Sequence, residues 1–152
     1  MSRRLAISLL TAGLLIGALP LGAAASTPVA VTIDIHEDFA EATGTFTAQS
    51  AVLCESGTTS TLTRVTGSGA TLNFHSLKTF TCADGSGTFT LRIQARVMPC
   101  AASDWGSWSV AGGTGDYEDL HGTGTVVGTY FPNDACDAEG IDDHLTGRLI
   151  QG

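Results

Sequence analysis

Two short clusters near the ends of the chain combine histidine with carboxylates. His36-Glu37-Asp38 precedes the first turn, and Asp142-Asp143-His144 lies close to the C-terminus. Imidazole and carboxylate groups are the usual general acids and bases, and together they can bind divalent metals. The clusters form one site only if the fold brings them to the same end of the molecule. Solvated surface charge is the alternative, and the one that we favour.

The segment from Asn133 to Asp143 is a third concentration of charge, with five carboxylates around Cys136. Hard oxygen ligands of this kind suit weak calcium binding, although the spacing does not match an EF-hand loop. Ordinary surface acidity is the alternative, and we favour it over calcium binding. We therefore predict no metal site and no cofactor.

Aromatic residues in the second half of the chain are the candidates for binding a ligand. Trp108, Tyr117 and Tyr130 are the ones that we single out, with Trp105 and Phe131 close by. Such side chains line pockets for apolar molecules, and they also fill ordinary cores. The choice depends on the architecture that holds them.

Several function classes are disfavoured. The chain has no Gly-x-Ser-x-Gly elbow, and its glycine-rich run lacks the Gly-Lys pair of a phosphate-binding loop. A formal net charge of −8 disfavours nucleic acid and anionic membrane surfaces as partners. We assign no catalytic residue, and an enzyme is the less favoured interpretation.

The N-terminus has the pattern of a secretory signal peptide. Arg3 and Arg4 precede an apolar run from Leu5 to Leu21, and three alanines end at Ala25. We predict cleavage before Ser26 and a secreted protein. No second long apolar stretch follows, so no membrane span is expected.

The remaining residues, 26–152, suffice for one domain with its own core. They contain four cysteines, namely Cys54, Cys82, Cys100 and Cys136. An even number in an exported chain predicts two disulfides in one of three pairings. The long gaps between the cysteines do not suit a zinc site.

Apolar and polar residues alternate in several segments, as in half-buried strands. The alternation is most regular over 89–97, and Val29 to Ile35 show it as well. Leu77 is out of phase with Leu72, Phe74 and Phe80, which predicts a bulge near Ser76 or burial on both faces. About eight strands are expected, namely 29–36, 42–53, 59–66, 70–81, 89–97, 107–111, 122–131 and 143–150.

Glycine and β-branched residues recur too often for helices, so the predicted fold class is all-β. Short connections favour antiparallel strands in up-and-down order, and closure into a barrel removes the exposed edges. A two-sheet sandwich is the alternative. Strand ends two apart in an up-and-down barrel share a rim, which favours pairing Cys54 with Cys82 and Cys100 with Cys136.

A glycine-rich turn joins two of the predicted strands. It runs through Gly112-Gly113-Thr-Gly115-Asp-Tyr117 and continues to Leu120-His-Gly122-Thr-Gly124. Glycine allows positive φ and close strand approach there. This run resembles the signature of the allene oxide cyclase-like and dirigent-like barrel superfamily, which includes secreted bacterial members of unknown role. Trp108-x-Val110, the segment 79–91 and the segment 143–149 add to the resemblance.

The resemblance implies an eight-stranded antiparallel up-and-down barrel with a central cavity, but it transfers no reaction. We expect a disulfide-stabilised binding or interaction module whose ligand is a small hydrophobic molecule. One alternative is an isomerase or cyclase that works in the same cavity. Another is a structural extracellular protein whose barrel is packed throughout.

Overall fold

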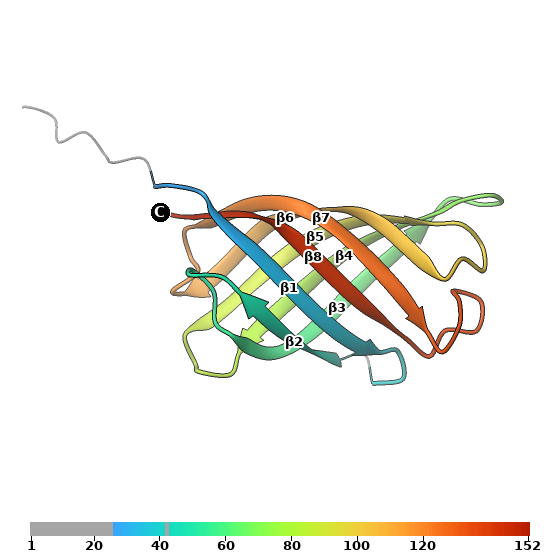
Figure 1. Cartoon of the computed structure of the whole chain (residues 1–152), viewed down its shortest axis with the longest axis horizontal. Helices are drawn as coiled ribbons and strands as arrows, with labels where there is room; N and C mark the ends of the chain where they lie inside the picture. Colours follow the sequence, from blue (N-terminus) through green and yellow to red (C-terminus); the bar gives the residue numbers. More distant parts are fainter. Residues whose placement is uncertain (1–25, 42) are drawn as a thin grey trace, which may run out of the picture.

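The computed structural model describes residues 26–41 and 43–152, so the predicted signal peptide, residues 1–25, lies outside the described residues. The described chain is all-β and contains no helix. The strands wrap diagonally around a single barrel (Figure 1). They are β1 (Val29–Asp38), β2 (Thr43–Gln49), β3 (Ser56–Thr66), β4 (Leu72–Cys82), β5 (Gly87–Val97), β6 (Ser103–Gly115), β7 (Leu120–Phe131) and β8 (Gly140–Gln151).

Each strand pairs antiparallel with the next one in the chain, and β1 pairs with β8 to close the barrel. In the β1–β8 pairing that closes the barrel, Val29 lies opposite Leu149 at one end and Asp38 lies opposite Gly140 at the other. The C-terminus therefore lies beside the start of β1 (Figure 1). The predicted up-and-down barrel is confirmed, and the sandwich is wrong, because closure gives every strand two hydrogen-bonded neighbours.

Strand alternation determines which side chains fill the interior. On β5, Phe89, Leu91 and Ile93 are buried inside the barrel, while Arg92 between them faces solvent. Each fully buried side chain of this kind contributes about 1.5–3 kcal/mol of hydrophobic free energy. The regular alternation in the sequence thus corresponds to one dry and one wet face.

The barrel has two rims. The closed rim carries the turns 50–55, 83–86 and 116–119, together with both ends of the described chain. The open rim carries the other four connections. A disulfide joins Cys54 to Cys82 at the closed rim, and another joins Cys100 to Cys136 at the open rim. Both predicted pairings are confirmed, and in the chain-entropy model each contributes about 3–4 kcal/mol.

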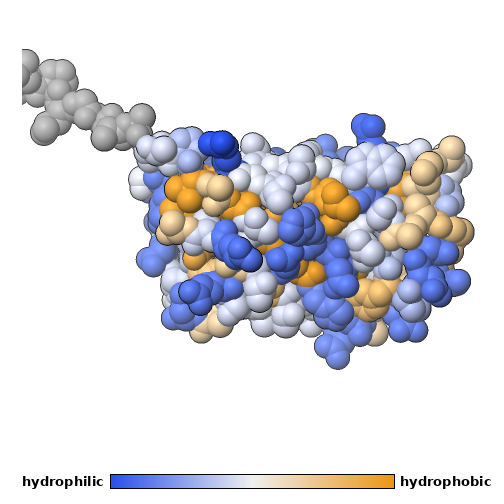
Figure 2. Space-filling model, viewed as in Figure 1, coloured by the Kyte–Doolittle hydropathy of each residue, from blue (hydrophilic) through white to orange (hydrophobic). Residues whose placement is uncertain are grey.

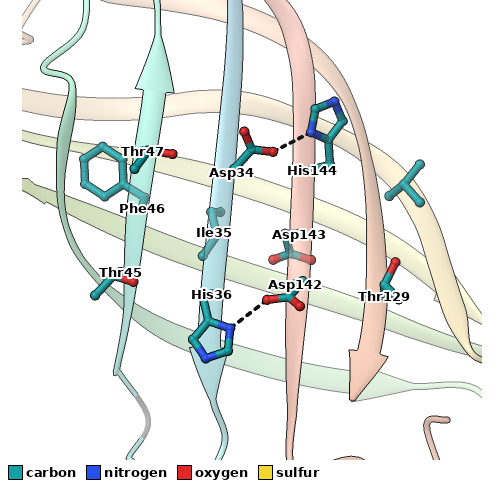
Figure 3. A pocket seen from close by; sticks show the side chains of 11 residues that line it. Asp34, Ile35, His36, Thr45, Phe46, Thr47, Thr129, Asp142, Asp143 and His144 are labelled. Atoms are coloured by element: carbon teal, nitrogen blue, oxygen red, sulfur yellow. Dashed lines mark hydrogen bonds and ion pairs between the residues drawn. The ribbon is translucent and has the colours of Figure 1, made fainter. Parts of the chain in front are cut away.

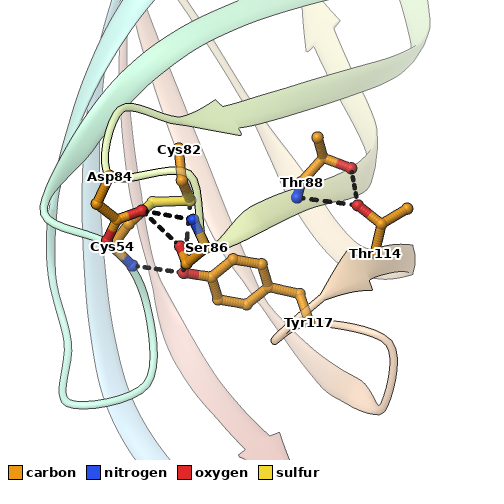
Figure 4. Close-up of a disulfide and its surroundings, with 7 residues drawn as sticks. All are labelled: Cys54, Cys82, Asp84, Ser86, Thr88, Thr114 and Tyr117. Carbon is orange, nitrogen blue, oxygen red and sulfur yellow. Dashed lines mark hydrogen bonds between the residues drawn. A yellow bond between two sulfur atoms is a disulfide. The ribbon is translucent and has the colours of Figure 1, made fainter.

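The glycine-rich turn joins two strands, β6 and β7, as predicted, and the structure places it at the closed rim. Gly115 has a φ of 62°, a left-handed conformation that glycine adopts without strain. The turn directs Tyr117 toward the disulfide, where its hydroxyl accepts a hydrogen bond of 3.0 Å from the backbone N–H of Cys54 (Figure 4). The same oxygen lies 2.9 Å from the hydroxyl of Ser86. These contacts tie three closed-rim turns together.

The bulge predicted near Ser76 is wrong. The pairing of β4 with both neighbours is continuous over residues 73–81. Leu77 is out of phase because it faces outward, opposite Leu62 on β3, and both side chains are exposed. The register shift in the barrel lies on β6 instead, where Ala111 has no partner on β5.

The half of the interior next to the closed rim is solidly packed. Phe80 and Phe89 stack there, with ring centroids 4.5 Å apart, and Phe46 meets both rings edge-on. The indole of Trp108 fills the space beside Gly124, where a side chain would come within 2.6 Å of the ring. The barrel is therefore sealed at this end.

Candidate functional site

The open half of the barrel contains a cavity of about 480 Å³. Apolar side chains from four strands form much of its wall, namely Leu72, Phe74, Ile93, Val97, Val126 and Ile141. A volume of this size lies within the usual range of small-molecule sites. The interior is therefore packed at one end and hollow at the other.

Three charged side chains form the floor of the cavity. The ammonium group of Lys78 lies 2.5 Å from Oε2 of Glu37 and 2.8 Å from Oδ2 of Asp143. The three groups come from β4, β1 and β8, and all are buried. Thr61 donates a further hydrogen bond of 2.9 Å to Oε2 of Glu37. Two carboxylates thus hold one ammonium at the boundary between the packed and hollow halves.

The protonation of Lys78 follows from its partners. Burial alone lowers the pKa of an ammonium group, but attraction by Asp143 and Glu37 outweighs it, so the pKa of Lys78 is raised above its ordinary value. The side chain is a cation with two acceptors at neutral pH. It is therefore unsuited to act as a nucleophile, which requires a neutral amine.

A second pair of polar groups lies on the cavity wall. The hydroxyl of Tyr130 donates a hydrogen bond of 3.0 Å to Oδ2 of Asp104, and the backbone N–H of Gly128 donates one of 3.2 Å to Oδ1. Burial raises the pKa of the Asp104 carboxyl, as does the nearby charge of Asp143, although the Tyr130 hydrogen bond opposes the shift. Burial, followed by Asp104, raises the pKa of Tyr130.

Gly128 lets the two aspartates approach each other. A Cβ atom on this glycine would lie 2.6 Å from Oδ1 of Asp104 and 2.8 Å from Oδ1 of Asp143. Real Cβ atoms essentially never make such short contacts, so a side chain at this position would displace the two carboxyl groups from their present positions. The floor and the wall thus form one connected polar surface.

The mouth of the cavity lies at the open rim. Phe39 from the β1–β2 connection borders it, as do Pro99 and the Cys100–Cys136 disulfide. This disulfide links the β5–β6 and β7–β8 connections, so it restrains two of the four connections at this rim. The covalent link therefore holds part of the entrance in place.

The three aromatic candidates lie in different places. Tyr130 lines the cavity. Trp108 belongs to the packed half, where its indole N–H donates a hydrogen bond of 3.1 Å to the carbonyl of Thr125. Tyr117 caps the same half at the closed rim. Only Tyr130 of the three borders the cavity.

The two histidine-containing clusters do meet, because β1 and β8 are neighbours. Strand alternation nevertheless divides them. The outward residues form two cross-strand pairs (Figure 3), His36 with Asp142 at 2.7 Å and His144 with Asp34 at 2.6 Å. All four side chains are more than half exposed. These pairs match the surface-charge interpretation, since exposed ion pairs contribute little.

The inward residues of the same clusters, Glu37 and Asp143, form the floor of the cavity. Sequence reasoning missed their role, and it missed Lys78 altogether. The alternation of buried and exposed positions along β1 could have revealed the inward position of Glu37, because Glu37 continues the apolar series Val31, Ile33, Ile35. A charged residue in the buried phase of a strand indicates either an ion pair or a functional site.

The acidic segment 133–143 does not gather its carboxylates around one point. Asp142 points outward to His36, and Asp143 points inward to Lys78. Within residues 26–41 and 43–152, one group brings three potential metal ligands within 4.8 Å of one another, and it consists of Asp134 with Cys100 and Cys136. Its two sulfur atoms are bonded to each other, so they are not available as thiolate ligands.

One face of the outer surface is mixed in character. Figure 2 shows hydrophilic side chains interspersed with small apolar patches. Among the described residues, no helix has the length and apolar character needed to cross a bilayer. Two disulfides are consistent with an extracellular protein.

Comparison of the chain with protein-family models, with curated proteins and with solved structures finds no match. The assignment of function therefore depends on the chemistry of the cavity. Its apolar wall can bury a small organic molecule, and its polar groups can orient one end of that molecule.

Proposed function

We propose that this protein is a secreted barrel that binds one small, largely apolar molecule in the open half of its interior. The observation that carries the proposal is the combination of an apolar wall with the buried Lys78, Glu37, Asp143 and Asp104 groups at its inner end. Ligand pockets typically have this composition, with a few polar groups among apolar ones. The resemblance to allene oxide cyclase-like and dirigent-like barrels is part of the proposal.

The expected affinity is moderate. Each methylene moved from water into the apolar wall contributes about 0.8 kcal/mol. The binding free energy of drug-sized ligands averages about 0.3 kcal/mol per heavy atom, and only the smallest ligands approach about 1.5 kcal/mol per heavy atom. A ligand of about ten heavy atoms is therefore expected to bind in the millimolar to micromolar range, with retention during purification at the tight end.

Native mass spectrometry of the protein recovered from the medium of its producing cells tests this proposal. The expected result is a second mass peak, heavier by one small molecule, that disappears on denaturation. Thr63→Trp is the matched variant, because Thr63 borders the cavity and a bulky side chain there would fill it. The proposal would be contradicted if the second peak appeared neither for the protein as recovered nor for the protein incubated with decanol.

A second candidate function is that of an isomerase or cyclase acting in the same cavity. The observation in its favour is the buried Asp104 carboxyl on the cavity wall, because burial raises its pKa and so favours the protonated form that a general acid needs. Tyr130 is hydrogen-bonded to Asp104 and would orient it. In such an enzyme the apolar wall would hold a reactive substrate in one conformation.

Styrene oxide, an apolar epoxide that opens under acid catalysis, is a suitable probe for the second candidate. Incubation with the protein is expected to rearrange the epoxide to its isomer phenylacetaldehyde faster than buffer does, with C–O cleavage and a hydride shift and no addition of water, and Asp104→Asn is expected to remove the acceleration. Asp119→Asn at the closed rim is the matched control. A rate that is the same for Asp104→Asn and the unchanged protein would exclude Asp104 as the acid.

A further inference from the structure

We propose that the molecule bound in the cavity carries a protonated amine, which occupies the space between Asp104 and Asp143. This inference rests on the proposed function, because it concerns the same cavity. It specifies the class of ligand as a small apolar ammonium compound.

The first argument is the balance of charge. Three carboxyl groups border the cavity, on Glu37, Asp104 and Asp143, whereas Lys78 is the single basic side chain among the lining residues. Its ammonium compensates at most one of them. A buried excess of negative charge is unfavourable unless a cation compensates it. The cavity therefore has room for one further positive charge.

The second argument is the position of the available oxygen atoms. Lys78 contacts Oδ2 of Asp143, so Oδ1 of Asp143 lies outside this ion pair. The same oxygen approaches Oδ1 of Asp104 where Gly128 lacks a side chain. An ammonium group has three donors and can reach two acceptors placed in this way. Charge-assisted hydrogen bonds of this type are stronger than neutral ones.

The third argument excludes other kinds of ligand. A carboxylate or phosphate ligand would face the excess negative charge and be repelled. A bare metal ion would need several converging oxygen ligands. The carboxylates of the cavity do not form such a group, since the one three-ligand cluster among the described residues is at the open-rim disulfide. An organic cation satisfies both the carboxylates and the apolar wall.

The state of Asp104 agrees with this assignment. Burial and the neighbouring charge of Asp143 raise the pKa of Asp104 in the unliganded protein. A bound ammonium would oppose that effect, because an adjacent positive charge favours the ionised carboxylate. A bound ammonium and the surroundings of Asp104 therefore shift its pKa in opposite directions, which links binding of the ligand to pH.

Calorimetric titration with decylamine, decanol and decanoic acid tests the inference. The three probes have the same alkyl chain, so the apolar contribution cancels, and near neutral pH they carry a positive, zero and negative charge. We expect decylamine to bind about ten- to a hundredfold more tightly than decanol. We expect decanoic acid to bind most weakly.

Asp104→Asn is the informative variant, because it removes one negative charge and nearly preserves shape. It should reduce decylamine binding about tenfold or more while leaving decanol binding unchanged. Asp119→Asn makes the same chemical change on an exposed residue at the closed rim and should alter neither. Thermal unfolding verifies that each variant is folded, and Asp143→Asn replaces Asp104→Asn if the latter is not.

The outcomes separate this inference from the proposed function. Binding of decanol and decylamine with equal affinity would overturn the cationic ligand while leaving an apolar ligand in place. Tightest binding of decanoic acid would overturn it as well. Failure of all three probes to bind would contradict the proposed function itself. Preference for decylamine that survives both Asp104→Asn and Asp143→Asn would move the amine elsewhere and overturn the assigned position.

Discussion

Replacement of Lys78 by methionine tests the arrangement of charges at the floor of the cavity. Methionine has nearly the same length and flexibility, so the change removes the ammonium group with little loss of packing. The side chain of Lys78 is only 4% exposed, and its partners Glu37 and Asp143 are each 9% exposed. The substitution therefore leaves two carboxylates buried without their cation.

The expected loss is large. Removal of one partner from a buried ion pair costs about 3–5 kcal/mol, mainly because the remaining charge stays desolvated. A domain with a typical stability of about 5–15 kcal/mol would lose a substantial fraction of it. At this chain length the melting temperature should fall by roughly 6–20 °C.

The loss should also depend on pH. In the Lys78→Met variant, Glu37 and Asp143 are buried without a cation, so the ionised carboxylates destabilise the folded state. Protonation at low pH removes this penalty, whereas ionisation at higher pH restores it. The deficit relative to the unchanged protein should therefore be smallest near pH 4 and largest near pH 8.

The stability of the unchanged protein should depend on pH mainly in the alkaline range. The raised pKa of Lys78 means that its contribution to stability is fully present at neutral pH and is lost only above the ordinary titration range of lysine. Urea unfolding followed by circular dichroism, carried out from pH 4 into the alkaline range, measures the pH dependence of both proteins. The matched control is Arg92→Met, because Arg92 is an exposed cation on the neighbouring strand.

Arg92→Met should change the free energy of unfolding by no more than about 0.5 kcal/mol. Equal free energies of unfolding for Lys78→Met and Arg92→Met at neutral pH would refute this reasoning. They would mean that the carboxylates of Glu37 and Asp143 are solvated or protonated. If the stability lost in Lys78→Met did not change with pH, loss of the ion pairs would not be its cause.

Three further predictions concern other parts of the barrel. Tyr117→Phe should lower stability by about 1–3 kcal/mol in urea unfolding, because it leaves the buried N–H of Cys54 without an acceptor, and an unchanged midpoint would contradict this. Gly147→Ala should cost at least about 1–3 kcal/mol because the new methyl would collide with Trp108, with a changed near-ultraviolet signal of the indole as the readout. Decylamine binding should weaken as pH falls from 8, because burial raises the pKa of Asp104 and its carboxylate regains a proton at a higher pH than an ordinary aspartate; calorimetry that shows constant affinity down to pH 4 would exclude this role for Asp104 beside Tyr130, Lys78, Asp143 and Glu37.

Much of the architecture was predictable because local patterns and topology agree. The alternation over 89–97 predicted the buried face of β5, and short connections predicted sequential antiparallel pairing. The disulfide pairing then followed, since strands two apart end at the same rim. Strand boundaries were less predictable, because β6 extends over Ser103–Gly115, beyond the predicted 107–111. Its glycines have low intrinsic strand propensity and are placed there by close contacts between strands.

The floor of the cavity was predictable only in part. Glu37 and Asp143 were noticed as members of charged clusters, but clusters on a strand divide between its two faces, and the sequence alone does not say which charges meet inside. Lys78 shares the buried phase of Leu72, Phe74 and Phe80, which was a usable signal. The approach of Asp104 to Asp143 depends on the register of β6, β7 and β8, which no local pattern specifies.

The most direct test of the central claim is to locate a bound apolar probe by nuclear magnetic resonance. The protein with labelled methyl groups and unlabelled decylamine would be examined for intermolecular nuclear Overhauser effects. Contacts to the methyl groups of Val97, Val126 and Ile141, which line the cavity, are the predicted result. Contacts confined to the exposed Leu62 and Leu77 on the outer wall would contradict the claim.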